Sequence, residues 1–236
     1  MSSSLGHMPG DSWEFDSAVT DCFDDMFARS IPDFHNFREL CFYVGNRFIQ
    51  PDSDVVDLGC SRGGSLEPFV AASDDSVRFV GLECSKSMLQ AAQERFKDDK
   101  RVIVLDCDLK SGYTFADASL TLSIFTLQFI APVYRRRIIR NVFDSTRSGG
   151  AFILAEKIEG LTEPTRDLLI DTYHGFKHRQ GYSLQEIEAK RKSLEGVLTP
   201  YTDAENRMLL LAAGFNHVEC FWRSLNFAAW IAIKND

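Results

Sequence analysis

Glycines and acidic residues stand at the points where apolar runs of this 236-residue chain end. The run DVVDLG leads directly into CSRGG, which adds two more glycines within five residues. Glycines placed where a strand gives way to a helix permit close approach to the backbone. Glu83 closes the next apolar run, VRFVGLEC, and Asp108 closes the one after it, VIVLDCDL. Three consecutive strand ends therefore offer a glycine turn, a carboxylate and a second carboxylate.

This order of residues suits a sulfonium nucleoside better than a nucleotide. The turn lacks the Gly-Lys-Ser/Thr ending of a phosphate loop, and its spacing differs from Gly-x-Gly-x-x-Gly. A carboxylate at Glu83 could accept hydrogen bonds from both ribose hydroxyls. Asp108 could meet the exocyclic amine of adenine, and Asp57 or Ser61 the amino acid portion of the ligand. We therefore predict an S-adenosyl-L-methionine (SAM) site.

Strand and helix signals alternate along the chain, which predicts an α/β fold with a mainly parallel sheet and right-handed crossovers. In such a sheet the ligand lies at the carboxyl ends of the strands. Periodicity and caps predict helices at 16–29, 35–49, 65–73, 85–98, 132–146, 162–196 and about 202–213. Buried strands are predicted at 54–59, 77–84, 102–109, within 118–130, at 151–158, and near 217–223 and 226–233.

Composition excludes several classes of protein. The formal net charge of −8 argues against a protein that holds nucleic acid by neutralising phosphates, and the run VYRRRIIR at 133–140 is interpreted as a solvated helix face. The six cysteines form no C-x-x-C pair, so neither a metal site nor a disulfide framework is indicated. No apolar stretch is long enough for a bilayer span. We expect a cytoplasmic protein with a flexible leader at 1–12 and a single domain at 13–236.

The arrangement DLGC-x-x-G, GLECSKSML, DCDL and TLQF resembles the class I SAM-dependent methyltransferase superfamily. Within it, the chain most resembles the carboxy-S-adenosyl-L-methionine synthase family. Stretches unrelated to generic cofactor binding carry this likeness from about Trp13 to the last strand: ARSIPDF, RFIQP, FTLQFI, AEKI, HGFKHRQGYS, EIEAKRKSLE and AGF. The resemblance implies a Rossmann-like fold with a seven-stranded sheet, helices on both faces, N-terminal helices and a helical insert at about 160–200.

Members of that family convert SAM and prephenate to carboxy-SAM and phenylpyruvate, which supplies tRNA wobble-uridine modification. The resemblance implies that Arg191 corresponds to the family's arginine that pairs with the extra carboxylate, a role that suits a planar guanidinium. It also implies a homodimer, with the insert as interface or lid. The predicted cofactor contacts are Phe34, Asp57, Gly59, Cys60, Ser61, Glu83, Cys84, Met88, Asp108, Leu109, Ile124 and Phe125.

The chain departs from the family pattern at three places. Phe34 replaces a tyrosine, Ile124 replaces an asparagine, and Glu83 with Cys84 replaces an aspartate-asparagine pair. Loss of a hydroxyl and an amide would leave an anionic sulfonium substituent poorly satisfied. These departures favour the plain methyl sulfonium of SAM.

Three functions remain open. The favoured one is a methyltransferase acting on a small acceptor that bears a carboxylate, such as a 2-oxo acid, with Arg191 holding that carboxylate and His174, Tyr182 or Tyr173 as candidate bases. The alternative is a carboxy-SAM synthase with an altered pocket. A third possibility is a non-catalytic SAM-binding partner protein. None of the three predicts a membrane or a direct nucleic-acid contact.

Overall fold

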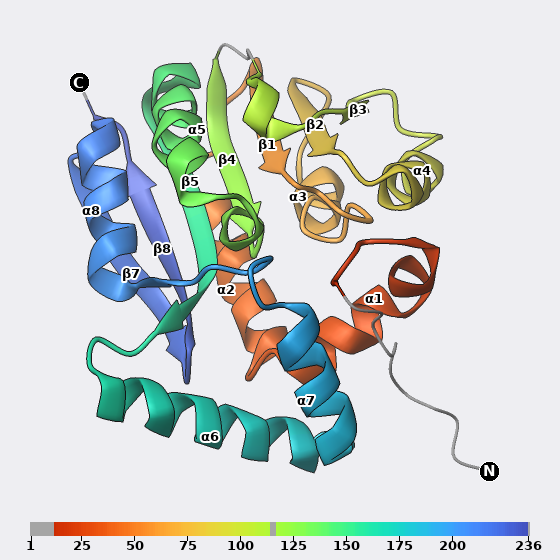
Figure 1. Cartoon of the computed structure of the whole chain (residues 1–236). Helices are drawn as coiled ribbons and strands as arrows, with labels where there is room; N and C mark the ends of the chain where they lie inside the picture. Colours follow the sequence, from red (N-terminus) through yellow and green to blue (C-terminus); the bar gives the residue numbers. More distant parts are fainter. Residues whose placement is uncertain (1–11, 114–116, 236) are drawn as a thin grey trace.

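The computed structural model describes residues 12–113 and 117–235, so nearly all of the predicted leader at 1–12 lies outside the described residues. Within them the chain forms one twisted sheet with helices on both faces and a helical insert at one end (Figure 1). The strands are β1 (Ser53–Leu58), β2 (Val77–Glu83), β3 (Val102–Asp106), β4 (Ala118–Ile124), β5 (Thr146–Glu159), β6 (Tyr201–Thr202), β7 (His217–Ser224) and β8 (Phe227–Ile233). The α-helices are α1 (Ser17–Ser30), α2 (Phe34–Gly45), α3 (Glu67–Ala72), α4 (Lys86–Arg95), α5 (Pro132–Ser145), α6 (Glu163–Arg179), α7 (Leu184–Ser193) and α8 (Asp203–Ala213).

The strand order is β3-β2-β1-β4-β5-β8-β7, and the short β6 pairs with the end of β5. Strands β1 to β5 run parallel, whereas β8 is antiparallel to both of its neighbours. The chain winds outward from β1 to β3 and then returns to β4 on the other side. This topology confirms the predicted α/β class, and it leaves a crevice at the carboxyl ends of β1 and β4.

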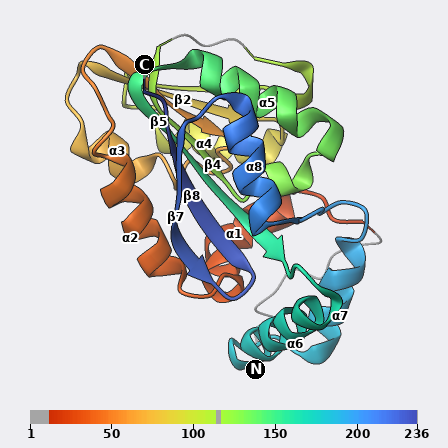
Figure 2. The same cartoon turned by 90° about the vertical axis from the view of Figure 1, so that its left-hand side faces the viewer.

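Two apolar layers cover the sheet. Helices α2, α3 and α4 pack on one face around Phe37, Phe69 and Phe79, while α5 and α8 pack on the other around Ile138 and Trp230. Figure 2 shows α2 and α3 on the opposite side of the sheet from α5 and α8. Because both faces are covered, the central strands read as near-continuous apolar runs, which is why they could be located from the sequence.

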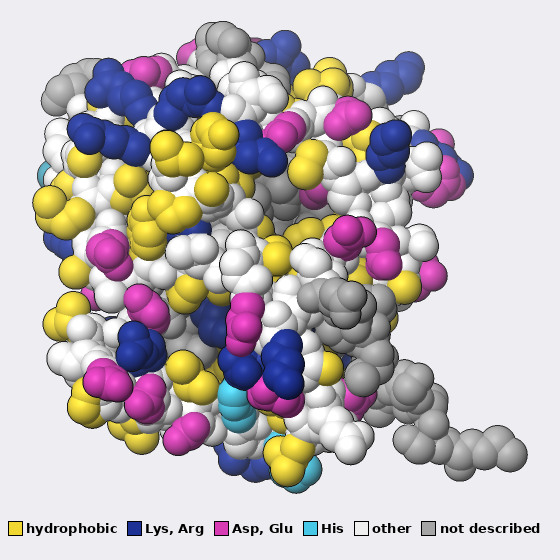
Figure 3. All heavy atoms as spheres, in the orientation of Figure 1, with side chains coloured by type: hydrophobic (Ala, Val, Ile, Leu, Met, Phe, Trp, Pro, Cys, Tyr) yellow, Lys and Arg dark blue, Asp and Glu magenta, His cyan; other side chains and the backbone are white. Residues whose placement is uncertain are grey.

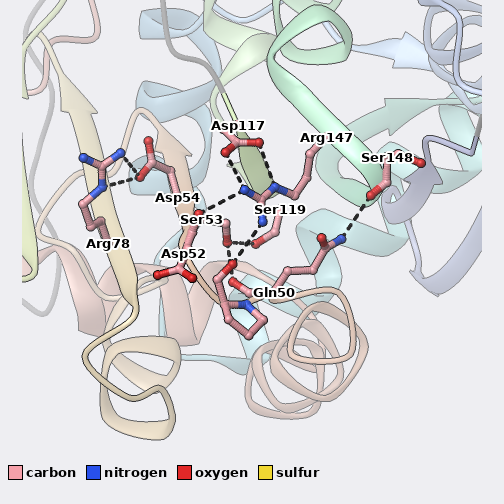
Figure 4. Close-up of polar contacts among 10 residues, drawn as sticks. Gln50, Asp52, Ser53, Asp54, Arg78, Asp117, Ser119, Arg147 and Ser148 are labelled. Carbon is pink, nitrogen blue, oxygen red and sulfur yellow. Dashed lines mark hydrogen bonds and ion pairs between the residues drawn. The ribbon is translucent and has the colours of Figure 1, made fainter.

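Polar contacts tie the amino ends of the strands together (Figure 4). Arg147, at the start of β5, donates to the carbonyl oxygens of Pro51 (3.1 Å) and Asp52 (3.0 Å) and pairs with Asp117. Arg78 on β2 pairs with the buried Asp54 of β1 at 2.8 Å. These ion pairs lie at the amino ends of the strands, opposite to the crevice at the carboxyl ends.

The predicted helix at 162–196 is two helices, α6 and α7, separated by Gly181 with φ +92°. Ser183 and Glu186 form a capping box that starts α7, because each side chain accepts the backbone N–H at the other residue. Helix α6 follows β5 directly, and both helices lie beyond the carboxyl ends of the strands (Figure 1).

The basic run in α5 differs in part from its interpretation as a solvated face. Arg136, Arg137 and Arg140 are exposed, and Lys and Arg side chains gather over α5 in Figure 3. Arg135 is buried, and it donates to the carbonyl oxygens of Ile130 (2.8 Å) and Thr199 (2.7 Å). One arginine of the run therefore anchors the segment that follows α7.

Candidate functional site

A cavity of about 330 Å³ lies at the carboxyl ends of β1 to β5. Its floor comes from the strand ends and the turns behind them, and α1, α6 and the residues from Lys190 to Leu198 enclose it. The predicted residues that line it are Gly59, Ser61, Glu83, Cys84, Asp108, Leu109, Ile124 and Phe125. The structure thus brings eight of the predicted site residues together in the expected crevice.

The glycine turn is shaped by close contacts with the protein's own side chains. A Cβ at Gly59, where φ is +74°, would lie 2.4 Å from Cγ2 of Thr126. A Cβ at Gly63, where φ is +79°, would lie 2.3 Å from the ring of Phe96. Ser61 also adopts a left-handed conformation, with φ +49°. These contacts let the turn lie flat across the ends of β1 and β4, with Gly59 and Ser61 facing the cavity.

Glu83 connects the glycine turn to the start of α4. One carboxylate oxygen accepts from the backbone N–H of Ser61 (2.9 Å), and the other from those of Cys84 (2.9 Å) and Ser85 (2.8 Å). Burial raises the pKa of Glu83, and the three N–H groups oppose that rise. A carboxylate has about four lone-pair sites and these N–H groups use three, so Glu83 can hold the turn and still accept from a ligand hydroxyl through the oxygen that faces Ser61.

Asp108 follows β3 and caps the short turn Leu109–Ser111, because Oδ1 accepts from the backbone N–H of Lys110 at 3.0 Å. Asp57 and Met88 lie behind the cavity wall, not in it. No described residue donates a hydrogen bond to either carboxylate oxygen of Asp57. Burial and the neighbouring Glu83 raise the pKa of Asp57 to about 8.

Phe34 and Ile124 meet beside the glycine turn. They line a second cavity, of about 60 Å³, together with Cys60 and with the same Gly59 and Ser61 that line the first. The Phe34 ring packs against Phe27 and Phe37, with ring centroids 6.0 and 6.4 Å apart. Two of the three departures from the family pattern therefore lie in one apolar wall.

Three predicted residues of the insert lie outside the cavity lining. Arg191 projects from α7 and pairs with Glu188 (2.8 Å) and Glu195 (2.6 Å), which makes it part of a charged helix face in this conformation. His174 is half-buried on α6, and burial with the nearby Lys157 and Lys177 lowers its pKa. Tyr182 is buried and shares a hydrogen bond with Ser30 at 3.1 Å.

The cavity contains residues that the sequence reasoning did not select. Lys157 of β5, Tyr173 of α6 and Lys190 of α7 line it together with Gln128. Of these, the sequence predicts Tyr173 only as a candidate base, and Lys190 is the neighbour of the predicted Arg191. A usable signal was the single lysine near the end of the buried run AFILAEKI.

Helix α1 and α7 meet over the cavity. Trp13, Phe23 and Met26 form an apolar cluster, with Leu194 and Val197 packed against it, and the backbone N–H of Trp13 donates to the Ser193 carbonyl at 2.9 Å. Among residues 12–113 and 117–235, no group of acidic, histidine or cysteine side chains is placed to hold a metal. Over the same ranges, no helix has the length and apolar character of a membrane span.

Comparison with known proteins matches both the cavity and the insert. Residues 55–150 match the methyltransferase domain family. A carboxy-S-adenosyl-L-methionine synthase from Sulfurimonas denitrificans is 35% identical over 222 residues, covering 94% of each chain. A protein of the same name from Nitratiruptor sp. is 37% identical and covers 94% of this chain and 93% of its own. The structure of human N-acetylserotonin methyltransferase in complex with SAM superposes with a TM-score of 0.63 at 12% identity, covering 93% of this chain and 56% of that one, a likeness of fold alone.

Proposed function

Because the chain belongs to the carboxy-S-adenosyl-L-methionine synthase family, we propose that it converts SAM and prephenate to carboxy-SAM, phenylpyruvate and water, the water being formed from the ring hydroxyl of prephenate and a proton of the SAM methyl group. The chain is a SAM-dependent transferase with a methyltransferase fold. The observation that carries the proposal is the extent of the likeness, since 94% coverage includes the glycine turn and most of the α6–α7 insert. By analogy with the family, the product would serve tRNA wobble-uridine modification.

This proposal replaces the methyltransferase reading that the sequence favoured. That reading rested on Phe34 and Ile124, and the apolar wall they form is a real feature of the structure. The relatives that match over 93–94% of their own length are nevertheless named as synthases, which supports the alternative better than methylation of a small acceptor.

The residues present fit the sulfonium cofactor. The unpartnered carboxylate of Asp57 lies behind the glycine turn, and Glu83 and Asp108 present acceptors at the next two strand ends. The turn would hold the methionine portion, Glu83 the ribose hydroxyls and Asp108 the adenine amine. SAM supplies the methyl carbon that gains the carboxyl group. The apolar side chains of α1 would exclude water from that carbon.

The experiment is mass spectrometry of the products formed from SAM and prephenate whose ring carboxyl carries a ¹³C label. We expect carboxy-SAM that carries the label and phenylpyruvate that does not, in equal amounts. Methylated acceptor without carboxy-SAM would restore the methyltransferase reading. SAM binding without turnover of any small carboxylate would support the third possibility, a non-catalytic partner.

We further propose that two chains associate through the charged α6–α7 insert, as the resemblance implies. Light scattering of the purified protein tests this, because a monomeric mass at working concentration contradicts it. Arg191 does not line the cavity of its own chain. In a dimer, the Arg191 of one chain could reach the cavity of the other.

A further inference from the structure

Three lysines converge on one end of the main cavity. Lys157 and Lys190 line it, and Lys177 lies buried directly behind, on α6. Their ammonium groups face aromatic rings: Lys157 is 4.9 Å from the Tyr173 centroid, Lys177 is 4.7 Å from that of Tyr182, and Lys190 is 4.4 Å from that of Trp13. They come from β5, α6 and α7, so the tertiary fold brings them together.

No acidic side chain of the described residues forms an ion pair with any of the three lysines. The Lys190 ammonium has Sδ of Met26 as its nearest polar contact, at 3.0 Å. A thioether and aromatic faces are weak partners for a desolvated charge, whose burial is costly unless it is paired.

The charged groups around the three lysines do not neutralise them. The charge of Glu186 raises the pKa of Lys177, but less than burial and Lys157 lower it, and Glu186 caps α7 by accepting from the backbone N–H of Ser183 at 2.7 Å. Arg29 adds a further positive charge, although it is paired with Asp25 at 2.5 Å. Cys22 faces Lys190, and His174 lies near Lys157 and Lys177.

The lysines also repel one another. Burial, followed by the charges of Lys177 and Lys157, lowers the pKa of Lys190 to about 7. Burial lowers the pKa of Lys157 to about 8, and burial with the charge of Lys157 lowers that of Lys177 to about 8. An anion in the cavity would relieve both the desolvation and the repulsion.

We propose that Lys157 and Lys190, supported by Lys177, bind a carboxylate of the acceptor in the cavity that Gly59 and Ser61 also line. The inference rests on the proposed function only for the identity of the acceptor, prephenate. A ligand held there by one carboxylate would place its remaining atoms in the same cavity as Gly59 and Ser61. The lysines would thus position the acceptor against the sulfonium, independently of Arg191.

The test is calorimetric titration of prephenate into the full chain saturated with S-adenosylhomocysteine, which prevents turnover. The variants are Lys157→Gln and Lys190→Gln, with Lys190→Arg as the variant that keeps the charge. Lys192→Gln, exposed on the same helix, is the matched control. SAM affinity is measured for each variant in a separate titration, and far-UV circular dichroism verifies folding.

We expect each glutamine variant to weaken prephenate binding at least tenfold with SAM affinity changed less than twofold. Lys190→Arg should recover much of the loss, and Lys192→Gln should match the unaltered chain. Prephenate affinity within twofold of normal in both glutamine variants would overturn the proposal, as would a parallel loss of SAM affinity.

The same calorimetric titration, carried out with phenylpyruvate as well as prephenate and read together with the product assay, separates this inference from the proposed function. If the unaltered chain makes no carboxy-SAM and yet binds phenylpyruvate in a manner that requires Lys157 and Lys190, the carboxylate site stands and the synthase proposal fails. If carboxy-SAM forms while both lysine variants bind prephenate normally, the synthase proposal stands and the carboxylate site fails. Binding of neither carboxylate by the unaltered chain also overturns the site.

Discussion

Replacing Lys190 by methionine should stabilise the ligand-free protein at neutral pH. The pKa of Lys190 is about 7 in the folded chain, against 10.5 for the ordinary side chain. Between these values the unfolded chain holds a proton that the folded chain lacks, so the free energy of unfolding rises with pH through this range. Methionine has a similar length, carries no charge and retains the packing against Trp13 and Met26.

The size of the effect follows from the shift in pKa. One pKa unit corresponds to about 1.4 kcal/mol. At pH 7 the lysine would therefore cost about 4 kcal/mol relative to its neutral form, and at pH 9.5 about 1 kcal/mol. The stability advantage of Lys190→Met over the unaltered chain should therefore shrink by about 3 kcal/mol between these two pH values. Titrating groups remote from Lys190 are common to both proteins and cancel in the difference, whereas Lys177 and Lys157, whose charges lower the pKa of Lys190, do not.

Urea unfolding followed by circular dichroism at several pH values measures this difference. Lys192→Met, an exposed change on the same helix, should give a difference independent of pH. Two results would refute the view that Lys190 is a buried, uncompensated cation. One is a difference in the free energy of unfolding between Lys190→Met and the unaltered chain that does not change with pH. The other is a loss of stability of Lys190→Met at pH 7 that persists at lower pH. Saturating prephenate should reduce the stability advantage of Lys190→Met by about 1.4 kcal/mol for each tenfold difference in prephenate affinity between the two proteins.

Three further changes test other parts of the structure. Gly59→Ala should lower the free energy of unfolding by about 2–4 kcal/mol in urea unfolding, because the left-handed φ and the Thr126 contact both oppose a Cβ; Gly64→Ala, where only Arg38 comes within 4 Å at 3.9 Å, is the control. Arg191→Ala should leave SAM affinity within about twofold by calorimetry and abolish turnover; a large loss of SAM affinity would mean that Arg191 contacts the cofactor. Arg147→Met should lower stability by about 1–3 kcal/mol, because the carbonyls of Pro51 and Asp52 lose a charged donor, while an altered SAM affinity would contradict the separation of the two ends of the sheet.

The sequence predicted the sheet and the meeting of the strand-end residues in one crevice, for a physical reason. Strands buried on both faces appear as apolar runs, and residues at their carboxyl ends must meet at one edge of the sheet. Gly59, Glu83 and Asp108 were therefore placed correctly relative to one another without any knowledge of packing. The glycine turn was only partly understood, because the side chains that approach it, Thr126 and Phe96, are distant in sequence.

The lysines that line the cavity could not be predicted in the same way. Lys190 and Arg191 are adjacent, and successive residues of a helix point about 100° apart, so only the docking of α7 on α1 decides which one faces the cavity. Charged residues occur all along the insert, so the sequence pattern does not show which of its faces points toward the cavity. Lys157 was recognisable as a lysine in an apolar strand, but its role depends on α6 and α7, which the strand pattern does not place.

The enclosure formed by α1 and α7 has a kinetic consequence. The glycine turn and the lysines open into one cavity, and the segments over it are joined by the hydrogen bond between Trp13 and Ser193. Under the proposed function the carboxyl group passes directly between the two substrates in this cavity, so both must be present together before either product leaves; this predicts a sequential mechanism and not a ping-pong one. Double-reciprocal plots at several concentrations of the second substrate should intersect, and release of the products through a shared opening becomes the step best placed to limit turnover.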